Sequence, residues 1–270
     1  MLYLLLSVLC SVLIANFLML MGRRGQTSML PVFLGNYFVA SLSSYLTMPR
    51  LVPTTAFDLG FGIITGALFL GNFWVYQKCI ACNGLSLSVG VMRIAMIVPV
   101  LVAVVWFQEQ LGILNGLGIV LGLAAFTLKS DPKALHSFLW IVGLFAISGL
   151  TDASLKIFKE LGSGNEAGFV YIIFTSAFVF TLLLILVGRI RFTWQGILLG
   201  CLLGVPNRYS TVFFLKGLDS IPAALAYPIV AVSIVLLSIV SDLAIWHKQA
   251  SRRDVLLWAL LLVSLVLLNL

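Results

Sequence analysis

The chain has very little charge. Only 9% of its 270 residues are Asp, Glu, Lys or Arg, whereas 61% are hydrophobic. In a typical soluble domain about a quarter of the residues are charged, so this shortage excludes an ordinary soluble domain. A membrane-spanning helix needs roughly 20 apolar residues, which leaves room for about ten spans and for no catalytic lobe outside the membrane. The lipid bilayer is therefore an expected partner.

Cysteine and the motifs of common enzymes are also scarce. The chain has four cysteines, and its one C-x-x-C pair, Cys79 and Cys82, has no second pair or neighbouring histidine to complete a metal site. It contains no G-x-x-x-x-G-K-[ST] phosphate loop, no H-E-x-x-H motif and no G-x-S-x-G motif. We therefore expect no metal, no cofactor and no enzymatic activity.

The basic residues outnumber the acidic ones without forming a basic face. The formal net charge is +7, but the sixteen Lys and Arg residues are spread singly between apolar runs. This distribution is typical of loops between membrane spans and not of a nucleic-acid-binding surface. We expect no nucleic-acid partner.

What the sequence does contain is a series of long apolar runs. Such runs, without the alternation of a barrel strand, favour helices that satisfy their own backbone hydrogen bonds in lipid. The fold class predicted is an all-α integral membrane protein with ten transmembrane helices. Breaks at charged residues, Gly and Pro place these helices at 2–21, 30–48, 58–79, 84–107, 111–128, 138–158, 168–188, 194–216, 221–244 and 254–270.

Matching residues recur at a spacing of about half the chain, which predicts an internal repeat. The predicted repeats are 1–135 and 136–270, with five helices each, within one membrane domain. Because five is odd, the second repeat enters the membrane in the opposite sense. The matches are Gly62 and Gly66 with Gly196 and Gly200, Asn72 with Asn207, Gly84 with Gly217, and Glu109 with Asp242.

The predicted fourth helix carries a proline followed by an acid near its end, Pro99 and Glu109 in PVLVAVVWFQEQLG. Together with ten spans in two repeats, this resembles the drug/metabolite transporter superfamily, in particular proteins with two EamA-like domains. The resemblance implies transport without ATP of amino acids, nucleotide sugars, sugar phosphates or quaternary amines. In many inverted-repeat transporters the substrate site lies near the midplane between the halves.

Four ionisable side chains fall well inside predicted helices, where each costs several kcal/mol unless it has a partner, water or a function. Asp152 and Lys156 are four residues apart with the acid first, which suits an ion pair on one helix face. Asp152 alternatively meets a basic residue of another helix, or serves as a coupling site for a proton or another cation.

The other two ionisable residues, Arg93 and Arg208, have no acid at helical spacing. A guanidinium group matches a carboxylate or phosphate with two parallel hydrogen bonds. Both arginines are therefore predicted substrate contacts. The alternative for each is a structural link to Asp152 or to helix-end carbonyls.

Four uncharged residues complete the predicted substrate site. Pro206 is expected to bend its helix beside Asn207 and Arg208, and bent helices at matching positions of the two halves mark transport sites. The added candidates are Asn72, Asn207, Trp74 and Tyr227, and for Trp74 the alternative is ordinary packing.

These expectations define a secondary active transporter for a small polar metabolite, either an amino acid, a carboxylate or a phosphorylated solute, moved by alternating access. A proton is the candidate coupling ion. We expect a monomer or homodimer in a bacterial inner (plasma) membrane. The alternative function is a lipid-headgroup flippase or scramblase, which would need an opening between helices toward lipid.

Overall fold

The fold is entirely helical in the part of the chain that the structure describes. The computed structural model describes residues 1–23, 29–48, 54–83, 85–128, 138–245, 247 and 252–270, and no strand occurs among them. The prediction of an all-α protein is thereby confirmed.

The helices fall where the apolar runs predict them. The fourth predicted span corresponds to three consecutive elements, and each of the other nine corresponds to one helix. The elements are α1 (Leu2–Arg23), α2 (Leu30–Thr47), α3 (Ala56–Asn83), α4 (Leu85–Ile94), α5 (Ile97–Leu101), the π-helix η1 (Val102–Trp106), α6 (Ile113–Leu128), α7 (Phe138–Leu161), α8 (Glu166–Val187), α9 (Trp194–Gly217), α10 (Ala223–Ala244) and α11 (Arg252–Leu268).

Among the described residues, six helical segments are long and apolar enough to cross a membrane, not the ten predicted. They are Ala56–Ile80, Ser88–Trp106, Phe138–Leu161, Glu166–Val187, Trp194–Gly217 and Ala223–Ser241. Shorter apolar helices lie at Leu2–Phe17, Ile113–Ala125 and Val255–Leu268. Six candidate spans are consistent with a multi-pass membrane protein.

The chain forms two compact units, and each takes residues from both halves of the sequence. Unit 1 comprises Met1–Leu70 and Ile157–Gly217, and unit 2 comprises Gly71–Lys156 and Leu218–Leu270. The change from one unit to the other falls within α3, within α7 and after α9. The predicted repeat boundary between 135 and 136 lies outside the described residues.

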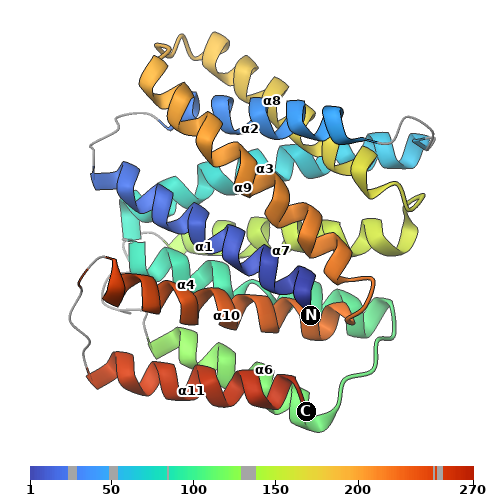
Figure 1. The fold of residues 1–270 in the computed structure, drawn as a ribbon, viewed down its shortest axis with the longest axis vertical. Coiled ribbons are helices and arrows are strands. Elements are labelled where there is room, and N and C mark those ends of the chain that lie inside the picture. Colours follow the sequence, from blue (N-terminus) through green and yellow to red (C-terminus); the bar gives the residue numbers. More distant parts are fainter. Residues whose placement is uncertain (24–28, 49–53, 84, 129–137, 246, 248–251) are drawn as a thin grey trace. The chain divides into compact units, whose positions relative to one another are not determined.

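Unit 1 is held together by a close crossing of α2 and α9, which Figure 1 shows beside each other. A Cβ added at Gly200 would lie 2.0 Å from the backbone oxygen of Val32, and one added at Gly35 would lie 2.1 Å from that of Ile197. The two backbones therefore touch, as small residues allow membrane helices to do.

The N-terminus of α3 is fixed by the buried carboxylate of Asp58, also in unit 1. This group accepts hydrogen bonds from the backbone N–H of Thr55 (3.1 Å), the backbone N–H of Ser163 (3.1 Å) and the Ser163 hydroxyl (2.5 Å). In return, the Thr55 hydroxyl accepts from the Asp58 N–H at 3.1 Å, which completes a capping box. The start of α3 is thus tied to the loop between α7 and α8.

In unit 2, α6 and α11 run side by side (Figure 1). The Ser264 hydroxyl donates to the backbone oxygen of Gly118 at 2.6 Å, and Asn115 Nδ2 donates to the backbone oxygen of Leu267 at 3.2 Å. These side chains link helices that are otherwise apolar, as interhelical hydrogen bonds do in membranes.

Candidate functional site

The fourth predicted span is interrupted inside unit 2. Helix α4 ends at Ile94 and α5 begins at Ile97. Pro99 has no N–H to donate to Ala95, and its ring clashes with that carbonyl in a regular helix. The Val98 N–H bonds the Ala95 oxygen instead, at 3.0 Å. This break was not predicted, although Pro99, which the sequence shows only as part of a family pattern, is its signal.

Arg93 lies in the last turn of α4, directly before the break. It is partly exposed, and its buried Nε has no hydrogen-bond partner among the described residues. Its charge interacts with Asp152 of α7 and with Tyr76 of α3. In the described part of the chain Arg93 and Asp152 form no direct salt bridge, so their charges interact without direct contact.

Helix α7 brings Asp152 toward this break. One turn earlier on the same helix, a Cβ added at Gly149 would lie 2.5 Å from Val98 Cγ2 and 3.2 Å from the Ala95 oxygen. The Tyr227 hydroxyl of α10 donates to the backbone oxygen of Asp152 at 2.5 Å. Elements α4, α5, α7 and α10 therefore meet around one acid and one arginine.

Lys156, one turn after Asp152, pairs with an acid from another element. Its Nζ lies 2.5 Å from Glu109 Oε1 and 5.1 Å from the centre of the Phe107 ring. The Glu109 carboxylate also accepts from the first backbone N–H groups of α10, those of Ala223 (3.2 Å) and Ala224 (2.8 Å). Lys156 thus pairs with an acid from the segment after η1, in place of the predicted pairing within α7.

The Glu109 carboxylate is stabilised in its ionised form. Partial burial alone would raise its pKa, but the hydrogen bonds from Ala224, Lys156 and Ala223, together with the Lys156 charge, lower the pKa below its ordinary value. The positive end of the α10 dipole acts in the same sense. Glu109 therefore joins η1, α7 and α10 by electrostatics as well as by geometry.

Two other predicted substrate contacts lie in unit 2. Asn72 Oδ1 accepts from the Ser148 hydroxyl at 2.7 Å. Trp74 is 45% exposed and meets Trp140 edge to face, with ring centroids 5.6 Å apart. Asn72 has a structural partner, and Trp74 packs on an aromatic neighbour; contact of either with a solute stays a prediction.

Arg208 and Asn207 lie in unit 1, on α9. Arg208 is only 6% exposed; its Nε donates to Ser44 Oγ at 3.0 Å, and one terminal nitrogen donates to Thr47 Oγ1. Its other terminal nitrogen is buried with no hydrogen-bond partner in the described residues. Because Ser44 and Thr47 lie in the last turn of α2, the guanidinium is placed where a helix C-terminus attracts a cation.

Asn207 donates from Nδ2 to Oδ1 of Asn36 in α2 at 3.2 Å, in the buried crossing of the two helices. Helix α9 continues without a break across Pro206, where a bend was predicted, and the break between helices lies after Ile94. Asn36, Ser44 and Thr47 were not among the predicted site residues. Their signal is polarity within an apolar helix, but sequence does not reveal which helix they face.

The predicted site residues thus form two clusters, one in each unit. Arg93, Asp152, Lys156 and Tyr227 are joined through α4, α7 and α10, with Asn72 and Trp74 elsewhere in unit 2. Arg208 and Asn207 belong to unit 1. A cavity containing both arginines stays a prediction.

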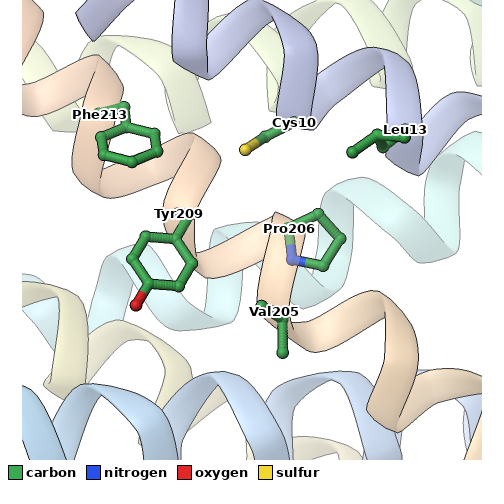
Figure 2. Close-up of a pocket in the computed structure, with 6 residues that line it drawn as sticks. All are labelled: Cys10, Leu13, Val205, Pro206, Tyr209 and Phe213. Carbon is green, nitrogen blue, oxygen red and sulfur yellow. The ribbon is translucent and has the colours of Figure 1, made fainter.

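An open apolar hollow of about 380 Å³ lies between α1 and α9 in unit 1. Figure 2 shows Cys10 and Leu13 approaching from α1 and the other lining residues from α9. The lining from α9 is Val205, Pro206, Tyr209 and Phe213.

Comparisons with known proteins give a fold but no activity. The chain is 21% identical over 267 residues to an uncharacterized protein of Haemophilus influenzae, a match that covers 91% of this chain and 90% of that one. A protein crystal structure superposes with a TM-score of 0.78 over 99% of this chain and 96% of its own, at 13% identity. No family model matches the sequence. The helical arrangement is therefore one that a solved structure shares.

Proposed function

We propose that this chain is a secondary transporter that moves a small polar solute with an anionic group across a membrane by alternating access. The observation that carries the proposal is Arg93 at a break in an apolar, span-length segment, within the electrostatic reach of Asp152. Interrupted membrane helices carry substrate and ion sites in many transporters. An intramembrane arginine with an unused donor is an anchor for a carboxylate or phosphate.

The proposed architecture is ten spans in two inverted repeats of five, 1–135 and 136–270, as in proteins with two EamA-like domains. Support comes from contacts within unit 1 that are exchanged when 137 residues are added to α2 positions and subtracted from α8 positions. Tyr37 and Phe174, whose rings are in contact, exchange places under this operation. Ser41 of α2 is carried to Phe178 of α8, and Thr175 of α8 to Phe38 of α2. Both the original pair and the resulting pair are in contact.

The proposed location is a bacterial inner membrane, supported by the apolar helices and by a relative in a bacterium. Binding by Arg93 is tested by thermal shift of the detergent-purified chain with acetate, L-glutamate, inorganic phosphate, glucose 6-phosphate and, as a cationic comparison, choline. A ligand at 100 times its Kd stabilises the folded state by about 2.7 kcal/mol. We expect at least one anion to stabilise the wild type.

The variants decide which arginine is involved. Arg93→Gln is expected to lose the anion-dependent shift, and Arg93→Lys to keep part of it. Arg191→Gln is the matched control, since it removes one exposed arginine from the loop after α8. A full shift in Arg93→Gln contradicts the proposal. If Arg208→Gln loses the anion-dependent thermal shift instead, the anion binds at Arg208 in unit 1.

The second candidate function is a lipid-headgroup flippase or scramblase. The observation that favours it is the apolar hollow between α1 and α9, whose lining suits an acyl chain. If this candidate holds, no soluble anion stabilises the protein, while lipids do. Substitution of Leu13 by Trp, which fills the hollow, then reduces lipid movement in reconstituted vesicles.

A further inference from the structure

Arg93 and Asp152 carry opposite charges that sum to zero, but the two side chains do not form a salt bridge among the described residues. Gly149 holds α7 against the α4 and α5 junction. Both Arg93 and Asp152 are partly exposed. The two side chains carry opposite charges, and neither is bound directly to the other. This arrangement suits an anionic ligand that takes the place of Asp152 beside Arg93.

Among the charged groups described around Asp152, Arg93 is the cation that acts on its carboxylate. On its own helix, the neighbouring Lys156 is bound to Glu109, which comes from the segment after η1. Helix α10 contributes Tyr227, bonded to the Asp152 backbone oxygen, and α3 contributes Tyr76, which interacts with Arg93. Within the described residues, the positive charge that acts on the Asp152 carboxylate is that of Arg93.

This arrangement sets a condition on any bound anion. With no ligand, the positive Arg93 and the negative Asp152 sum to zero. A monovalent anion at Arg93 leaves one net negative charge, and an uncompensated charge in the membrane interior costs several kcal/mol. One proton on Asp152 restores neutrality in the occupied state. The protein can then switch the site from one side of the membrane to the other, empty or loaded, without moving a net charge through the lipid.

We propose that an anionic solute and Asp152 compete for Arg93, so that each solute bound is accompanied by one proton taken up on the Asp152 carboxylate. The inference rests on the proposed transport function. In this step a carboxylate oxygen of Asp152 gains a proton from water on the side from which the solute enters. When the solute leaves, that O–H bond breaks and the carboxylate returns to Arg93. The result is electroneutral symport of one proton with one monoanion.

The first test needs no ligand. Infrared spectroscopy of the full chain at neutral pH detects the carbonyl stretch of a protonated carboxyl group. Arg93→Gln removes the counter-charge, and we expect it to add such a band that the wild type lacks. The band should be absent from Arg93→Lys and from Arg93→Gln/Asp152→Asn. A spectrum of Arg93→Gln identical to that of the wild type overturns the proposal.

The second test uses proteins that keep Arg93. Calorimetry with acetate, L-glutamate and inorganic phosphate should give an apparent affinity for the bound anion that rises up to tenfold for each unit by which the pH falls, after correction for the anion's own ionisation. In Asp152→Asn the affinity should not change with pH. Equal pH dependence in both proteins overturns the proposal. If no anion binds, the proposed function fails, while the infrared result still decides whether Arg93 keeps Asp152 ionised.

Discussion

Replacing Gly200 with alanine is expected to destabilise the protein by about 3 kcal/mol, the upper end of typical overpacking costs. The new Cβ would lie 2.0 Å from the Val32 oxygen and 2.9 Å from the Asn36 nitrogen, and both atoms belong to the backbone of α2. A flexible side chain can move aside, but here one whole helix must shift. Thermal unfolding in detergent measures the effect.

Gly60 provides the matched control, because it also lies in a helix of unit 1 and a Cβ added there meets nothing within 4 Å. Gly60→Ala is expected to leave the melting temperature unchanged or to raise it, since alanine favours the helix by up to about 1 kcal/mol. Equal stability of Gly200→Ala and the wild type would show that α2 and α9 do not cross this closely.

Replacing Glu109 with alanine is expected to cost about 3 kcal/mol at pH 7, because it leaves the buried Lys156 ammonium without its acid and two N–H groups of α10 without an acceptor. The double variant Glu109→Ala/Lys156→Met should be more stable than Glu109→Ala, because it removes the stranded charge as well. Glu160→Ala, which removes an exposed acid from α7, is the control.

The pH dependence has a defined sign. The pKa of Glu109 is lowered in the folded protein, so its contribution to stability is complete above the pKa of an unfolded Glu, about 4.3, and is lost as the pH falls through the lower folded value. The difference in melting temperature between the wild type and Glu109→Ala should therefore shrink in acid. A difference that does not change between pH 7 and the acid range contradicts the role given to this carboxylate.

The positions of the helices were predictable from sequence because lipid imposes both composition and length on an apolar run. The predicted run 138–158 became α7 at Phe138–Leu161, and 194–216 became α9 at Trp194–Gly217. The break after Ile94 was also predictable in principle, since Pro99 cannot donate to Ala95. Pro206 carries the same local signal but lies in a continuous helix, so tertiary packing decides between a break and its absence.

The partners of the polar residues were not predictable. A helix that is apolar nearly all round gives no periodic sign of which face meets which neighbour. Lys156 was therefore matched with Asp152, four residues away, although Glu109, 47 residues away, lies 2.5 Å from its ammonium. In the same way, nothing in the sequence directed Arg208 toward Ser44 and Thr47 at the end of α2.

The proposed role of Arg93 is tested most directly by counterflow in proteoliposomes. Vesicles holding the wild type are preloaded with unlabelled acetate, L-glutamate, inorganic phosphate and glucose 6-phosphate, and are then given a trace of each in labelled form. We expect at least one labelled anion to accumulate with the wild type and with Arg191→Gln, and its rate to fall at least about tenfold in Arg93→Gln, the equivalent of 1.4 kcal/mol. An undiminished rate in folded Arg93→Gln, or no accumulation of any anion by the wild type, would contradict transport of an anionic solute through Arg93.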